Sequence, residues 1–119
     1  MRTLTDHLVE GDDAPQVIVA VLDEPGQGGA CHLYSIQLPN RTTFAIHFQN
    51  GPIKEYGPNG VTDAALLAIL LDRLRGFQAG PYACPANHMA LTDGCSMLEW
   101  LQQRTRERLA RGVEGTNAK

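Results

Sequence analysis

The two halves of the chain carry different hydrophobic patterns, and their order along the sequence limits the folds it can adopt. The first half has short β-branched or alternating segments separated by Gly, Pro and Asn turns, and the second half has two long segments with helical spacing. Because strands come first and helices afterwards, this order indicates an α+β fold rather than a parallel βαβ sheet. We expect a small antiparallel β-sheet of about three or more strands, followed by a C-terminal antiparallel two-helix hairpin.

The segments within residues 15–49 predict an antiparallel β-meander. The last of them alternates most clearly, because Phe44 and Ile46 point to one side while Ala45 and His47 point to the other. Turn residues rich in Gly and Pro separate the segments and are typical of hairpin connections. We expect strands at residues 17–22, about 30–38 and 42–49.

The first helix of the hairpin is predicted from its start and stop signals. Thr62 is a suitable N-cap, the helix continues to Arg75, and Gly76 is placed to end it. Its apolar residues cover more than half of the helical circumference, which is wider than one packing contact requires. We therefore expect part of this surface to meet another helix or another chain.

The second helix is longer, and two of its cations lie on an unusual face. Pro85 suits its first turn, and the helix reaches to about Ala110, with Gly112 beyond it. At about 100° per residue, Arg104 and Arg108 continue an apolar packing stripe. That stripe is formed by Ala90, Gly94, Met97, Leu101, Arg104, Arg108 and Arg111, and Arg106 points to the opposite side.

Length and composition are typical of one domain, since the chain has 119 residues of which 43% are apolar. Around the sheet and the hairpin of residues 62–112 we expect an irregular arm at 1–14, a loop at 50–61 and a mobile tail at 113–119. The acidic start lacks the apolar core of a signal peptide, and no apolar run approaches the roughly 20 residues that cross a bilayer. We expect a cytoplasmic protein without a membrane partner.

Charge and cysteine content exclude some classes of function. The net charge of −3 argues against binding polymeric nucleic acid, which favours a basic excess. The three cysteines match no common zinc spacing, so we expect reduced thiols, no metal and no cofactor. Catalytic motifs are also missing. Cys84 and His88 could form a thiol and base pair, but no third orienting residue is nearby in the sequence.

Four residues form a candidate ligand-binding set. Phe77 and Asn87 flank the loop between the helices and could supply a stacking ring and an amide, while Arg104 and Arg108 could hold phosphates. The alternatives are a core Phe, a capping Asn and a solvated helix end with Arg favoured by the helix dipole. Together the four residues favour nucleotide binding without catalysis. A protein interaction module that binds a host factor through its apolar helix face is the other open hypothesis.

An ordered series of short motifs over residues 44–116 resembles a known family. The series is Phe48-Gln-Asn-Gly-Pro-Ile53, Asn59-Gly-Val-Thr62, Leu66-Leu67, Asp72-Arg-Leu74, Phe77-Gln-Ala-Gly-Pro81, Asn87, Ala90-Leu91, Trp100-Leu101, and Arg104-Thr-Arg106 to Gly112-Val-Glu-Gly-Thr116. In it the chain resembles the phage Thoeris anti-defence proteins of the first type. Their small antiparallel sheet precedes a helical hairpin that is related to the hairpin of phage anti-CBASS sponges.

The resemblance implies a function. Such proteins sequester cyclic ADP-ribose isomers made by bacterial TIR-domain proteins, without cleaving them, and also bind cyclic oligonucleotides of antiphage signalling. It implies that Phe77, Asn87, Arg104 and Arg108 bind the isomer, and it places no cyclic-oligonucleotide site on named residues. It also implies a homo-oligomer, a dimer or a hexamer built from dimers, that acts as a sponge in the host cytoplasm.

Overall fold

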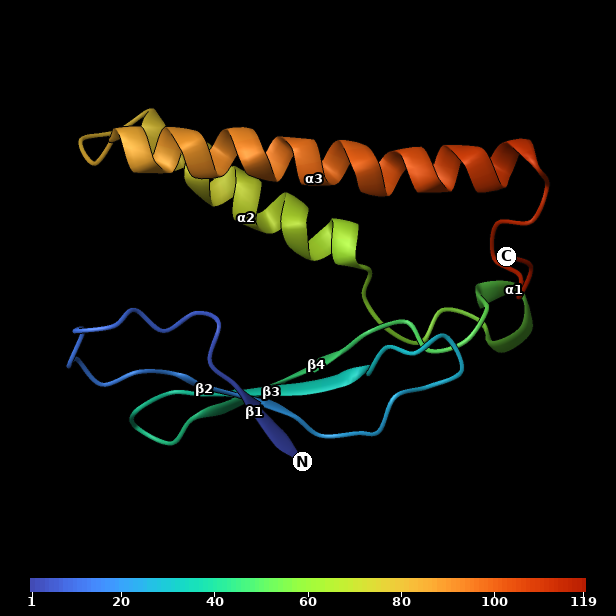
Figure 1. Cartoon of the computed structure of the whole chain (residues 1–119), viewed down its shortest axis with the longest axis horizontal. Coiled ribbons are helices and arrows are strands. Elements are labelled where there is room, and N and C mark those ends of the chain that lie inside the picture. The colour runs from blue at the N-terminus through green and yellow to red at the C-terminus, as the bar shows by residue number, and fades with distance from the viewer. The chain divides into compact units, whose positions relative to one another are not determined.

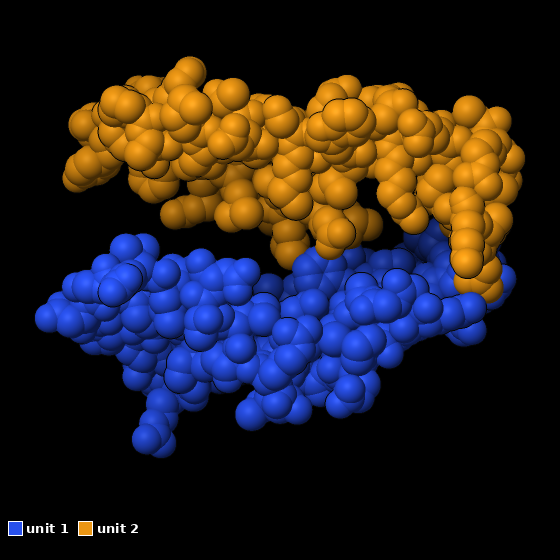
Figure 2. Space-filling model, in the orientation of Figure 1, with its two compact units in different colours: residues 1–61 blue, residues 62–119 orange.

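The computed structural model describes all 119 residues, and the chain divides into two compact units. The first unit is residues 1–61 and the second is residues 62–119, drawn in blue and orange in Figure 2. All the strands lie in the first unit, and the two long helices lie in the second. That the chain forms a single domain stays a prediction.

The first unit contains a four-stranded antiparallel sheet in the order β1-β2-β3-β4 (Figure 1). Its strands are β1 (Arg2–Leu4), β2 (Ile18–Val21), β3 (Leu33–Gln37) and β4 (Thr43–His47). The three predicted strands are confirmed, with the paired cores shorter than the segments expected. On one face the ring of Tyr34 meets Phe48 edge-on, with centroids 5.5 Å apart.

The strand β1 lies inside the segment that we expected to be an irregular arm, so that expectation was wrong for its first residues. Arg2 pairs with Val21, and Leu4 pairs with Val19. A strand of three residues is too short to show an alternating pattern, and the hydrogen-bonding edge of β2 decides its conformation.

A carboxylate pins the hairpin between β2 and β3. Asp23 accepts hydrogen bonds from the backbone N–H of His32 at 2.9 Å and of Leu33 at 3.1 Å. The hydrogen bond from His32, assisted by that from Leu33, lowers the pKa of Asp23 below its ordinary value, against a smaller opposing effect of desolvation. Ala20, Val21 and Cys31 are the buried residues of this unit.

The segment 50–61, expected to be a loop, is an ordered connection with one helical turn, α1 (Ile53–Tyr56). Asn59 closes it, because its Oδ1 accepts from Asn50 N at 2.8 Å and its backbone N–H donates to Gln49 Oε1 at 2.9 Å. A parallel bridge joins Phe48 to Val61. These interactions bring the two ends of the connection together.

The second unit is the predicted helical hairpin, formed by α2 (Asp63–Gln78) and α3 (Pro85–Ala110) (Figure 1). Thr62 Oγ1 accepts from Ala65 N at 3.1 Å, which confirms the predicted N-cap. The prediction that Gly76 ends α2 was wrong, because the helix runs through it to Gln78. A glycine inside a helix costs only about 1 kcal/mol, which tertiary packing can offset. None of the helices combines the length and the apolar character that a membrane span requires.

Close packing of the two helices depends on a glycine. Leu67 and Leu71 are the buried residues of α2, and a Cβ built at Gly94 of α3 would lie only 2.7 Å from Leu71 Cδ2. The face of α3 that packs against α2 also differs from the predicted apolar stripe. Met97 is 52% exposed, whereas the half-buried apolar positions are Leu91, Gly94, Leu98 and Leu101.

Candidate functional site at the two ends of the helical hairpin

Phe77 and Asn87 lie at the closed end of the hairpin, on either side of the connection between α2 and α3. Gln78 clamps this connection, since its Oε1 accepts from Cys84 N at 3.0 Å and its Nε2 donates to Cys84 O at 3.2 Å. The Cys84 thiol caps α3 by accepting from Asn87 N at 3.4 Å. The chain thus holds the phenyl ring and the amide at the same end of the hairpin.

Phe77 is not a core residue, because 40% of its surface is exposed. The guanidinium carbon of Arg73, one turn earlier on α2, lies 5.5 Å from the ring centroid, a cation–π contact. This contact restrains the ring while leaving part of it accessible. Sequence reasoning missed Arg73, because the predicted helix ended before Gly76 and left Phe77 outside it. The spacing of four residues indicates this pair only on a helix that runs to Gln78.

At the other end of the hairpin the two predicted arginines differ in their surroundings. Arg104 is exposed, and its guanidinium has no hydrogen bond or ion pair in the chain. The Arg108 side chain is only 11% exposed. It donates to the carbonyl oxygens of Val113, Thr116 and Ala118 at 3.0, 3.1 and 2.6 Å. The residues expected to form a mobile tail therefore carry the acceptors of Arg108.

Glu114 adds the only carboxylate that pairs with Arg108. Its Oε2 lies 3.3 Å from Arg108 Nε, yet this oxygen makes no directed hydrogen bond, so the contact is Coulombic. Sequence reasoning missed Glu114, since its contact requires the chain to turn back after α3. The signal that was present is Gly112, whose φ of 71° ends α3 as predicted and starts the reversal.

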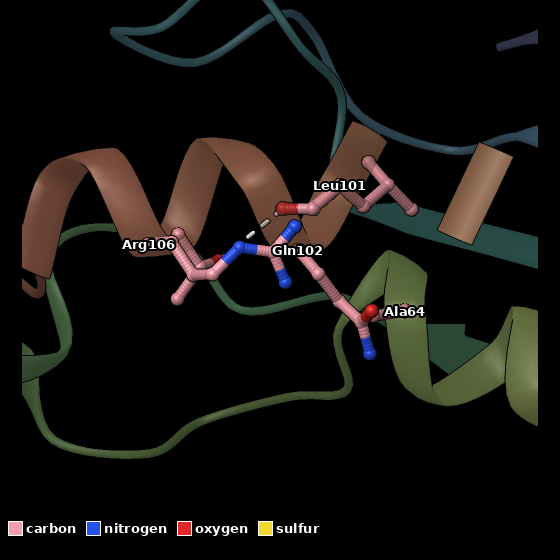
Figure 3. A pocket seen from close by; sticks show the side chains of 5 residues that line it. Ala64, Leu101, Gln102 and Arg106 are labelled. Carbon is pink, nitrogen blue, oxygen red and sulfur yellow. Dashed lines mark hydrogen bonds between the residues drawn. The ribbon is translucent and has the colours of Figure 1, made fainter. Parts of the chain in front are cut away.

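Arg106 belongs to a different surface from Arg104 and Arg108. Its Nη2 lies 2.9 Å from Glu99 Oε1 and also donates to Gln103. Figure 3 shows it beside a shallow open groove between α2 and α3, of about 320 Å³. The groove is lined by Ala64, Leu101, Gln102, Thr105 and Arg106. None of the four predicted ligand-binding residues lines it.

One chain does not bring the four predicted residues together. Asn87 lies in the first turn of α3 and Arg104 in its last third, so at about 1.5 Å per residue they are roughly 25 Å apart along the helix. Figure 1 shows α3 as one continuous helix that extends past the start of α2. The hairpin therefore presents two half-sites, an aromatic and amide half-site (Phe77, Asn87) and a guanidinium half-site (Arg104, Arg108).

The alternative thiol and base pair receives no support from the geometry. The Cys84 sulfur caps α3, and the hydrogen bond between Cys84 and His88 joins their backbones, from His88 N to Cys84 O at 3.1 Å. A nucleophile needs its base within hydrogen-bond reach, and the His88 imidazole makes no hydrogen bond to the thiol. The arrangement accounts for Cys84 as a helix cap.

Comparisons with known proteins agree with this description of the hairpin. A family model described as the Acb2/Tad1 hairpin domain matches residues 40–106. A protein named Thoeris anti-defense 1, from Bacillus phage SBSphiJ7, is 39% identical over 94 residues, which are 79% of this chain and 66% of that protein. The chain thus spans just under two thirds of the length of this relative. The family match includes Phe77, Asn87 and Arg104 and ends before Arg108.

Proposed function

The chain belongs to the Acb2/Tad1 hairpin-domain family, and on this premise we propose that it is a phage anti-defence sponge. It binds and sequesters, without cleaving, the cyclic ADP-ribose isomer signal (glyco-cyclic ADP-ribose) made by TIR proteins of Thoeris immunity. It does so in the cytoplasm of the infected host, where the effector is deprived of its signal. The name of the relative, Thoeris anti-defense 1, supports this assignment.

The chemistry of the two half-sites suits such a ligand. Phe77 offers a partly exposed ring on which the adenine stacks, and Asn87 offers an amide to its polar edge. Arg104 has a free guanidinium for the pyrophosphate, and a guanidinium fork binds phosphate oxygens in pairs. No activated nucleophile accompanies these groups. Binding without turnover is the function that they support, with cyclic oligonucleotides of CBASS-type immunity as a second proposed ligand class.

The separation of the half-sites carries the proposal further. A gap of roughly 25 Å along α3 is too wide for one cyclic dinucleotide-sized ligand to touch both half-sites of a single chain. A second copy with an antiparallel α3 would place its Arg104 and Arg108 beside Phe77 and Asn87 of the first. In a twofold dimer the exchange is mutual, which gives two equal sites. We therefore propose a homo-oligomer, a dimer or a hexamer built from dimers, as the binding form.

Binding and chemical recovery test the sponge. The full chain should bind glyco-cyclic ADP-ribose in titration calorimetry, and heating the complex should return the ligand intact. Light scattering should give at least a dimer. Absence of binding, or recovery of ADP-ribose in stoichiometric excess over the protein, contradicts the proposed function.

Mixing two defective variants tests whether the site is shared between chains. Phe77→Ala and Arg104→Ala should each bind poorly when alone. After unfolding and refolding together, mixed dimers carry both defects in one site and none in the other, so about a quarter of all sites should bind with wild-type affinity. A mixture that binds no better than either variant contradicts the composite site.

The exposed apolar face of α2 favours a second function. Ile69 is 58% exposed and Leu70 is 55% exposed, which suits a module that binds a host protein. This function requires a host protein in pull-downs and no shift in melting temperature with cyclic nucleotides. A melting scan with the cyclic ADP-ribose isomer therefore separates the two functions.

A further inference from the structure

The C-terminal turn, residues 113–118, is folded around the guanidinium of Arg108. Three carbonyl oxygens of the turn accept hydrogen bonds from Nη1 and Nη2 of Arg108, at 2.6 to 3.1 Å. The backbone of the turn is also tied to α3, because Val113 N donates to Arg108 O at 3.0 Å. A side chain that is 11% exposed and bonded in this way positions main chain as well as presenting charge.

Arg104 lies beside this turn. It precedes Arg108 by four residues on α3, so their Cβ atoms are about 5–6 Å apart on one face of the helix. Arg104 is exposed and has no partner, so an anion that binds its guanidinium lies next to residues 113–118.

The turn itself has a backbone donor to offer an anion. Thr116 N donates to Val113 O at 3.1 Å, and Gly115 has a φ of 80°, as expected at the third position of a type II turn. In such a turn the N–H groups of the two central residues, Glu114 and Gly115, stay outside the closing hydrogen bond. Neither donates to a group of the chain, but Gly115 is buried, so only the N–H of Glu114 is open to a ligand. Unpaired backbone N–H groups need acceptors, which phosphate oxygens supply.

We infer that Glu114 is a positioning residue of the proposed ligand site. Its carboxylate, 3.3 Å from Arg108 Nε, holds the turn and the guanidinium together, so that the turn forms one wall of the site beside Arg104. A guanidinium has five N–H donors, and with three bonded to carbonyls and Nε facing Glu114, one N–H of Arg108 Nη1 is left for a phosphate. This inference rests on the proposed function. It assigns an acidic residue to a site for an anionic ligand.

The direction in which ligand affinity changes when one negative charge is removed distinguishes a positioning role of Glu114 from simple Coulomb repulsion. Glu114→Gln and Glu107→Gln each remove one negative charge from the same end of α3, but Glu107 accepts from Gln103 at 3.1 Å rather than pairing with Arg108. Repulsion alone predicts that both variants bind an anion slightly more tightly. Glu107→Gln should bind glyco-cyclic ADP-ribose with wild-type affinity or up to about twofold more tightly. Glu114→Gln should bind it roughly threefold to tenfold more weakly.

Hydrogen exchange without ligand tests the position of the turn independently. The amides of Val113 and Thr116 should exchange faster in full-length Glu114→Gln and Arg108→Lys than in wild type or Glu107→Gln. Equal exchange in Glu114→Gln and Glu107→Gln overturns the inference, and so does binding by Glu114→Gln that is as tight as binding by Glu107→Gln. If wild type binds no cyclic ADP-ribose isomer, the proposed function fails, while the exchange rates still decide whether Glu114 holds the turn.

Discussion

The sheet unit and the hairpin unit are stabilised by different interactions. In residues 1–61 the buried apolar side chains are the small ones of Ala20, Val21 and Cys31, and side chains that bond to backbone, such as Asp23 and Asn59, close the connections between segments. In residues 62–119 buried leucines of α2 pack close to Gly94. All four predicted ligand-binding residues lie in the hairpin, at its ends and outside this packing. The hairpin should therefore be sensitive to side-chain volume at its centre and tolerant of substitution at its ends.

The largest expected effect is the loss of packing inside the hairpin. Leu71 is 1% exposed, so Leu71→Ala removes buried methyl groups and should lower the free energy of unfolding by about 2–5 kcal/mol. Denaturant unfolding followed by circular dichroism measures the change. Ile69→Ala on the same helix is the control, because Ile69 is 58% exposed and its loss should be far smaller. Equal losses in the two variants would mean that α2 does not pack through the Leu71 face.

The second largest effect should be a loss of ligand affinity without a loss of stability. Arg104→Ala removes a guanidinium with no partner in the chain, so unfolding should be unchanged. Affinity for glyco-cyclic ADP-ribose should fall about tenfold to a hundredfold, since charge-assisted bonds to phosphate contribute about 1.5–3 kcal/mol. Arg106→Ala should change affinity little, because Arg106 pairs with Glu99 on a different surface. Loss of binding in Arg106→Ala with full binding in Arg104→Ala contradicts the assignment of the site.

A smaller effect on stability should come from the close approach of the two helices at Gly94. Its matched control is a second glycine substitution that should change stability in the opposite direction. In Gly94→Ala the new methyl would meet Leu71 Cδ2 at 2.7 Å, and overpacking of this kind typically costs about 1–3 kcal/mol. A gain of about 1 kcal/mol in helix propensity partly offsets it. Gly76→Ala inside α2 meets nothing within 4 Å and should stabilise the chain. Stabilisation by both substitutions in thermal unfolding would show that the helices leave room for a methyl group at position 94.

The smallest effect should come from the sheet unit and should depend on pH. The backbone N–H of His32 lowers the pKa of Asp23, so the folded state favours the carboxylate. The resulting stabilisation is fully present above the ordinary pKa of 3.8 and is lost as the pH falls through the lowered folded value. In Asp23→Ala the loss of stability between pH 7 and pH 3 should therefore be smaller than in wild type. Asp13→Ala is the control and should lose as much stability between pH 7 and pH 3 as wild type. If the two variants lose the same amount, Asp23 is not the source of this pH dependence.

Local patterns explain why the start of α2 and the end of α3 were predictable. Thr62 was predicted as the N-cap of α2 because its hydroxyl suits the free N–H groups of a helix start, and Gly112 was predicted to end α3 because it adopts a positive φ freely. Both signals act within a few residues of the chain. The order of strands and helices was predictable for the same reason, because hydrophobic periodicity reports the local secondary structure.

Contacts between distant residues explain what the sequence could not indicate. The strand β1 forms because β2 offers an unpaired edge, and α2 continues through the exposed Gly76 to Gln78, whose side chain bonds to the backbone of Cys84 before α3. The stripe on α3 was misplaced for a related reason. Several faces of that helix carry apolar residues, and only the position of Leu71 determines that the helix approaches through Gly94 rather than through Met97.

The sequence by itself determined the α+β order and the two helices of the hairpin, because both follow from local conformational preference. It also placed an aromatic ring, an amide and two guanidinium groups near the ends of those helices. Only the tertiary structure decided that Arg104 is free while Arg108 holds the C-terminal turn. That Asn87 and the arginines lie at opposite ends of α3 follows from the predicted helix itself, because a helix rises by about 1.5 Å per residue whatever its side chains. The surroundings of the two arginines do not follow from it, because the carbonyl groups that accept from Arg108 belong to a segment that turns back after the helix ends.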